Sequence, residues 1–142
     1  MIKDKKLTEN FMLSEFLYSK WFDKETQAKV IMLYNECKSV QYNIQKLANQ
    51  LQALRNELGV PVIINIAYRP VFYELSKGRD GTSKHTKGEA GDIKAQGLTP
   101  KYVASKIEQL INSGDMLQGG LGVYSTFCHY DIFFDKTNVR RW

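Results

Sequence analysis

Apolar residues in the first half of the chain recur at helical spacing. Between positions 30 and 58 they follow in steps of mostly three and four, at Val30, Leu33, Tyr34, Cys37, Val40, Ile44, Leu47, Leu51, Leu54 and Leu58. This spacing places them on one face of an α-helix, so we expect a single amphipathic helix here. Gly59 follows directly, at a position where glycine commonly ends a helix. A shorter helical turn is expected over residues 13–17.

The pattern changes after Gly59. Residues 60–68 are rich in β-branched side chains, which predicts a buried strand. Residues 70–88 are rich in Gly, Ser and Lys, and we expect a long connection without regular structure. Such connections inside compact domains are often functional. Residues 89–95 are expected to form a short strand.

The last third predicts one more helix and a hairpin. Thr99 and Pro100 are typical of a helix start, and apolar residues then continue on one helical face as far as Gly114. Residues 119–122 predict a turn, and residues 123–124 and 127–134 predict two strands. Helices packed on a small, mostly antiparallel sheet indicate an α+β fold, and the length favours one domain over residues 1–142.

Composition narrows the function classes. Hydrophobic residues make up 43% of the 142 positions and charged residues 25%, which excludes wholesale disorder. The formal charge of +5 suits an anionic partner, but no nucleic-acid-binding motif is present, so we expect no nucleic-acid partner. No apolar stretch has the length of a signal peptide or of a membrane span. We therefore expect a protein that is made in the cytoplasm without a signal peptide. We also expect it to be a monomer.

Two cysteines are too few for a disulfide framework. We expect Cys128 to be a small buried apolar residue. Two further groups of residues are each open to two interpretations. Tyr18, Trp21 and Phe22 are expected to pack the N-terminal helix on the core, with a groove wall as the alternative. The basic residues of the long connection are expected to be solvated, with binding of an anionic cell-wall polymer as the alternative; they are Lys77, Arg79, Lys84 and Lys87.

The two histidines lie in segments with nearby carboxylates. His85 precedes Asp92 by seven residues, and His129 lies on a predicted strand. A catalytic zinc site needs three nitrogen or oxygen ligands and one open position, and these three residues meet that need. Asp131 follows His129 by two residues and so shares its strand face. The spacing does not by itself bring His85 and His129 together, and both also suit ordinary surface or core positions.

The local sequence around these residues resembles a known family. The pattern Ser83-x-His85-x-x-Gly88-x-Ala90-x-Asp92, followed by His129-x-Asp131, resembles the zinc D-Ala-D-Ala carboxypeptidase and L,D-endopeptidase family. That family shares its fold with the hedgehog signalling domain. The resemblance extends over nearly the whole chain, through residues 11–16, 47–69, 119–124 and 139–142. It is strongest to the short, single-domain form common in phages and prophages.

The resemblance implies a role for each site residue. His85, Asp92 and His129 would bind Zn²⁺, and Arg69 would bind a carboxylate or carbonyl of a peptide substrate. A guanidinium suits this role because it clamps a carboxylate with two parallel hydrogen bonds. Ser83 and Tyr68 would help to bind the substrate. From the residues alone, Arg69 is equally a salt-bridged arginine at a strand end, and Ser83 a turn former.

The general base stays open between candidates. Many relatives carry an acidic residue shortly before the last histidine, and residues 123–128 contain none. Asp131 is a catalytic candidate that would accept the proton of a metal-bound water. It would alternatively orient His129 through a hydrogen bond. Glu89 is a third candidate, expected to face solvent. Relatives usually carry a small polar residue at the position of Ile66. The bulkier, apolar Ile66 would change the shape of the substrate cleft, so the identity of the substrate stays open.

Two functions follow as expectations. The first is a zinc-dependent peptidase that hydrolyses bonds involving D-amino acids in peptidoglycan stem peptides. Such an enzyme would act on the cell wall after release or as part of a phage particle. The alternative is a non-catalytic or weakly active zinc-binding structural module of a phage particle.

Overall fold

The fold is built around one four-stranded antiparallel sheet. A computed structural model describes residues 2–137 and 139–142. The strands are β1 (Val62–Ile66), β2 (Ala90–Ala95), β3 (Leu121–Val123) and β4 (Cys128–Asp131), in the spatial order β1-β2-β4-β3. Every neighbouring pair is antiparallel. Together with the helices, this sheet confirms the predicted α+β class.

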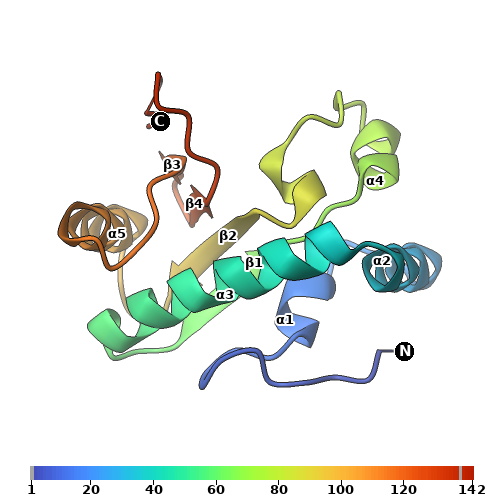
Figure 1. Cartoon of the computed structure of the whole chain (residues 1–142), viewed down its shortest axis with the longest axis horizontal. Helices are drawn as coiled ribbons and strands as arrows, with labels where there is room; N and C mark the ends of the chain where they lie inside the picture. Colours follow the sequence, from blue (N-terminus) through green and yellow to red (C-terminus); the bar gives the residue numbers. More distant parts are fainter. Residues whose placement is uncertain (1, 138) are drawn as a thin grey trace.

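The helices lie around the sheet as Figure 1 shows. They are α1 (Ser14–Leu17), α2 (Lys24–Glu36), α3 (Lys38–Leu58), α4 (Val71–Ser76) and α5 (Pro100–Ser113), with a 3₁₀ turn η1 (Lys84–Lys87). Gly59 ends α3 with a φ of 69°, and Gly114 ends α5 with a φ of 84°. Both ends fall where the sequence predicts them, because only glycine adopts this left-handed conformation without strain.

The single helix predicted over the stripe from residue 30 to 58 is wrong. The chain breaks at Cys37, which is extended with φ −123° and ψ 99°, so α2 and α3 are separate helices. The side chain of Gln41 donates to the carbonyl oxygen of Tyr34 at 2.9 Å and stabilises the break. The spacing continues across it because both helices turn an apolar face toward the same core, so periodicity alone does not reveal the interruption.

The predicted long connection over residues 70–88 is also partly wrong, because it contains α4 and η1. Tyr73 and Glu74 of α4 are buried, so packing rather than local propensity holds this short helix. Ser83 caps η1 by accepting a hydrogen bond from the His85 amide at 3.3 Å. The glycine-rich turn expected over 119–122 likewise gives its last two residues to β3.

The two faces of β2 have different surroundings. Gly91, Ile93 and Ala95 are buried, and α3 packs close to Gly91, since a Cβ there would lie 3.8 Å from a methyl group of Leu47. Asp92 and Lys94 alternate with them and point to the opposite face. That face therefore carries the polar side chains. None of the helices in the described residues is long and apolar enough to cross a membrane.

Candidate metal centre

Three potential metal ligands converge near the start of β2. His85 comes from η1, Asp92 from β2 and His129 from β4, and their ligand atoms all lie within 4.8 Å of one another. Asp92 and His129 are direct cross-strand partners. The amide of Arg69 donates to the His85 carbonyl oxygen at 3.0 Å, which ties η1 to the end of β1. The structure thus brings together two histidines whose proximity the sequence spacing left open.

Hydrogen bonds orient both imidazole rings. His85 Nδ1 lies 2.7 Å from the carbonyl oxygen of Ala67, and His129 Nε2 lies 2.8 Å from Asp131 Oδ2. Because these oxygens accept, the facing nitrogens carry the protons. His85 Nε2 and His129 Nδ1 lie 3.2 and 3.3 Å from Asp92 Oδ1, within hydrogen-bond distance, and with a cation bound their lone pairs would face the ion instead. Two imidazole nitrogens and one carboxylate oxygen are thereby directed at a common point.

The charges at this point are strongly coupled. Burial alone would raise the pKa of Asp92, but hydrogen bonds from His129 and His85 outweigh burial and hold that pKa well below its usual range. Burial would lower the pKa of His129, yet its hydrogen bonds with Asp131 and Asp92 raise it. Without a cation between them, the carboxylates therefore favour a proton on His129. A metal ion would replace that proton as the positive charge.

Asp131 lies behind His129 and is fully buried. Its two oxygens accept five hydrogen bonds, from the amides of Gly120 and Phe133, from His129 and twice from Arg140. A carboxylate offers about four lone-pair sites, so Asp131 is saturated. Burial opposes ionisation, but the bonds from His129 and Arg140 keep the pKa of Asp131 well below its ordinary value.

The other predicted site residues lie at different depths. A cavity of about 330 Å³ opens beside the three ligands and is lined by Arg69, Ser83, His85, Asp92, Tyr124, Phe127, His129 and Trp142. Arg69 and Ser83 thus reach the cavity. Tyr68 is only 5% exposed and belongs to the hydrophobic core. Glu89 is half-buried and, like Tyr68, lines neither this cavity nor its larger neighbour.

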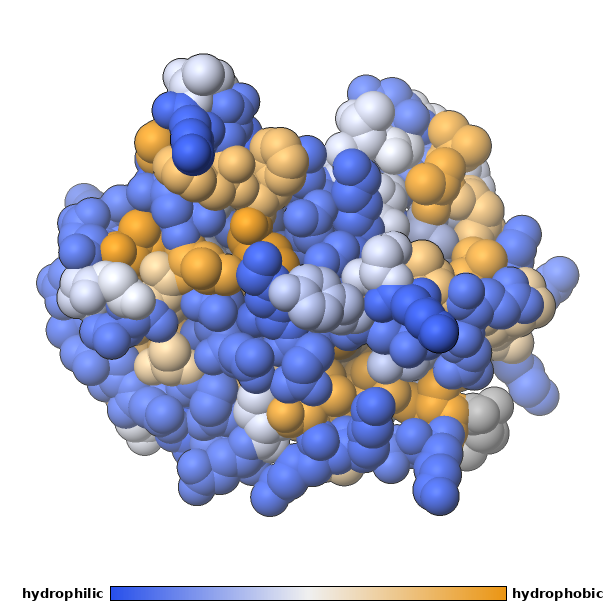
Figure 2. All heavy atoms as spheres, in the orientation of Figure 1, coloured by the Kyte–Doolittle hydropathy of each residue, from blue (hydrophilic) through white to orange (hydrophobic). Residues whose placement is uncertain are grey.

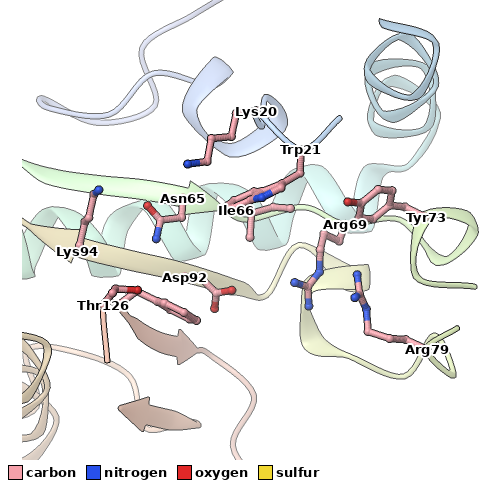
Figure 3. A pocket seen from close by; sticks show the side chains of 11 residues that line it. Lys20, Trp21, Asn65, Ile66, Arg69, Tyr73, Arg79, Asp92, Lys94 and Thr126 are labelled. Carbon is pink, nitrogen blue, oxygen red and sulfur yellow. The ribbon is translucent and has the colours of Figure 1, made fainter. Parts of the chain in front are cut away.

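A second, larger cavity of about 440 Å³ adjoins the first and shares Arg69, Asp92 and Phe127 with it. Figure 3 shows this larger cavity from close by. Trp21 lines this cavity and is 51% exposed, so the expectation that it packs on the core is wrong. Its neighbour Phe22 does pack, edge-to-face against Tyr73 at 4.9 Å. In Figure 2 the C-terminal segment and the region of α4 stand on either side of a hollow.

Sequence reasoning assigned no role to the residues after position 139. Residues 140–142 run parallel to β3, and the Trp142 amide donates to the Leu121 carbonyl oxygen at 3.1 Å. The Trp142 indole lies 5.0 Å from the His129 ring and donates to Tyr124 Oη at 2.6 Å. The resemblance of this ending to relatives was a signal, but only the folded chain shows that it meets His129.

The donor set fits zinc. Zn²⁺ accepts imidazole nitrogen and carboxylate oxygen, and catalytic zinc sites hold three such ligands and keep one position open. The three donors here come from three separate elements, and the cavity beside them gives access from one side. The hydrogen bonds to Ala67 and Asp131 supply the outer partners that orient metal-binding histidines.

Comparison with known protein families agrees with this geometry. The family model described as Peptidase M15 matches residues 11–131 of the 142-residue chain. The chain belongs to the peptidase M15 family. Membership supports the classes hydrolase and metallopeptidase, and the His85–Asp92–His129 cluster suits the zinc dependence of M15 peptidases. No curated protein gave a match to the chain.

Proposed function

We propose that this M15 member is a zinc-dependent peptidase that hydrolyses bonds involving D-amino acids in peptidoglycan stem peptides. The observation that carries the proposal is the inward orientation of three donor atoms, on His85, Asp92 and His129, beside an open cavity. The sequence resemblance supplies the substrate class, and the metallopeptidase family supplies the reaction type.

The chain's own residues would divide the work as follows. His85, Asp92 and His129 would hold the ion, which when bound acts as a Lewis acid and lowers the pKa of a bound water. Arg69 lines both cavities and would hold a carboxylate or carbonyl of the peptide. Ser83 Oγ lies 3.5 Å from Arg69 Nη2 and would help to hold that guanidinium in place.

Of the two roles considered for Asp131, we favour the orientation of His129. A general base needs a free lone pair within hydrogen-bond reach of the water. Asp131 is fully buried, and its oxygens are already occupied by five hydrogen bonds. We therefore assign Asp131 as a positioning residue that holds the His129 ring and keeps its proton on Nε2.

A digest of purified peptidoglycan tests the proposal. Protein loaded with zinc is incubated with the polymer, with and without excess EDTA, and soluble peptides are identified by mass spectrometry. We expect new peptide products that disappear with EDTA and with His85→Ala, and whose masses identify the bond. Lys87→Ala, an exposed change on the same turn, is the control and should retain full activity. Full activity and full zinc content in His85→Ala would refute the proposal.

One observation favours the second candidate, a zinc-binding module without catalysis. Among the described residues, Asp92 is the only carboxylate that lines either cavity, so no free acidic side chain stands ready as a base. This candidate predicts zinc binding with no cleavage of any peptidoglycan. It fails if the digest yields EDTA-sensitive products.

A further inference from the structure

A buried carboxylate joins two arginines in the wall of the larger cavity. Glu74, on α4, is fully buried. Its Oε1 lies 3.2 Å from Arg69 Nη2, and its Oε2 accepts a hydrogen bond from Arg79 Nε at 2.6 Å. A backbone hydrogen bond also joins Arg79 to Glu74, because the Arg79 amide donates to the Glu74 carbonyl oxygen at 3.0 Å. One negative charge therefore holds two positive charges side by side.

Both guanidiniums keep unused hydrogen-bond donors. In the described part of the chain, the two Nη atoms of Arg79 have no hydrogen-bond acceptor, and its side chain is 46% exposed. The Nε of Arg69 is buried without an acceptor. A guanidinium has five N–H donors in a planar fork, and two parallel bonds to a carboxylate are its strongest arrangement. Glu74 thus holds Arg79 through a hydrogen bond and Arg69 through an ion pair, in which Glu74 Oε1 forms no hydrogen bond, and the Nη atoms of Arg79 stay free.

The cavity around this pair is strongly cationic. Lys20, Arg69, Arg79 and Lys94 line it, against Asp92 as the one carboxylate among its lining residues. Figure 3 shows both guanidiniums at the same end of the cavity, with the Asp92 carboxylate nearby. Its volume of about 440 Å³ falls within the roughly 300–1,000 Å³ of ordinary ligand sites. Charge and size suit an anionic peptide larger than a single carboxylate.

We propose that Arg79 is a second substrate-binding residue, and that Glu74 positions Arg69 and Arg79 as paired anchors for two carboxylates of one peptide. The substrate would then carry an acidic residue at the cleft, with a side-chain carboxylate in addition to a main-chain carboxylate or carbonyl. This inference rests on the proposed function, because it specifies the substrate of the same site.

Two dipeptides that differ by one charge test the pairing. The probes are N-acetyl-D-Ala-D-Glu and N-acetyl-D-Ala-D-Gln, each methylated on the amide nitrogen to prevent hydrolysis, and titrated calorimetrically into zinc-loaded protein. We expect the D-Glu probe to bind about tenfold more tightly, as one charge-assisted bidentate contact allows. In Arg79→Gln the two affinities should become equal, with the larger loss on the D-Glu probe. Lys77→Gln removes a charge from the same segment outside the cavity and should keep the tenfold ratio.

The role of Glu74 has its own readout. Glu74→Gln should remove the preference for the D-Glu probe, so that the ratio of the two affinities falls to about one. Glu74→Asp should restore part of this preference. A purely structural Glu74 would instead change the unfolding temperature and leave the ratio intact. A ratio near one in the unmodified protein, or a tenfold ratio that survives Arg79→Gln, would overturn the inference. Because this readout is binding, it is independent of the digest, where the absence of EDTA-sensitive products would overturn the proposed function alone.

Discussion

Asp131 shows how a single residue constrains the metal centre. Both of its carboxylate oxygens act only as acceptors, in five hydrogen bonds from Gly120, His129, Phe133 and Arg140. An amide in this place would set its NH₂ against an N–H donor whichever way it turned. We therefore expect Asp131→Asn to weaken zinc binding by about 10–100-fold, as loss of an outer partner does elsewhere. Competition against a chromogenic chelator measures this affinity.

Activity at saturating zinc separates the two roles of Asp131. A positioning residue predicts that Asp131→Asn recovers much of its turnover once enough zinc is added. Unchanged zinc affinity together with abolished turnover would instead make Asp131 the base. Asp115→Asn is the control, because it removes an exposed carboxylate that is not among the candidate ligands. It should leave both the zinc affinity and the turnover unchanged.

The two cysteines are expected to differ in reactivity. A hydrogen bond with Ser39 and another from the Val40 amide lower the pKa of the Cys37 thiol. Burial raises the pKa of Cys128 to about 11. Since the thiolate is the reactive form, iodoacetamide near neutral pH should modify Cys37 and spare Cys128 in the folded protein. Peptide mass spectrometry over time measures both rates, and equal rates would contradict the prediction.

At the residue scale, the sequence was informative where chemistry follows a local pattern. His85, Asp92 and His129 stand in a recognisable spacing, and the structure brings their donor atoms together. The buried, apolar character expected for Cys128 is confirmed. The pairing of Glu74 with Arg79 and the contact of Arg140 with Asp131 have no such pattern, because they depend on how separate segments pack.

At the scale of the elements, the glycines directly before β3 leave no room for a side chain. A Cβ on Gly119 would overlap the carbonyl oxygen of Asp131. We expect Gly119→Ala to displace β4 and destabilise the protein by about 2 kcal/mol or more, in the range of overpacked cores. Zinc affinity should fall with it, because His129 lies on the same strand.

A matched glycine gives the control for this substitution. A Cβ on Gly91, beside Asp92 in β2, would meet its nearest neighbour at 3.6 Å, which is ordinary contact. Gly91→Ala should therefore destabilise the protein far less than Gly119→Ala. Chemical denaturation of both variants measures the difference, and equal free energies of unfolding would contradict the steric argument.

The helix boundaries predicted from the sequence agree with the structure where a local residue signal marks the boundary. Gly59, Thr99 and Gly114 each mark a helix end or start that the structure confirms. The break at Cys37 and the helix α4 carry no comparable signal. The first lies inside a continuous apolar stripe, and the second is six residues long and held by burial of Tyr73 and Glu74.

At the scale of the whole molecule, the candidate ligands come from three elements, so a bound ion should stabilise the fold. A ligand that binds only the folded state adds about 2.7 kcal/mol at a concentration 100-fold above its Kd. We expect zinc to raise the unfolding temperature and EDTA to reverse the rise. His129→Ala should abolish the effect, and Lys101→Ala, on the surface of α5, should retain it. An unfolding temperature insensitive to zinc would contradict the ligand assignment.

The spatial order of the strands is the part of the architecture that sequence reasoning left open. The antiparallel hairpin of β3 and β4 was expected, and it is confirmed. That β4 rather than β3 lies beside β2 has no local signal, yet it makes Asp92 and His129 cross-strand partners.

The two edges of the sheet differ in what they offer to another chain. Residues 140–142 run along β3, whereas β1 forms the opposite edge of the sheet. Free edges invite intermolecular strand pairing, which proteins discourage with proline and with irregular register. Pro61 precedes β1, and the register shifts between Ile64 and Ile66, beside Asn65 in the cavity wall. The register shift beside the cavity would therefore also make β1 a poor template for strand pairing with another chain.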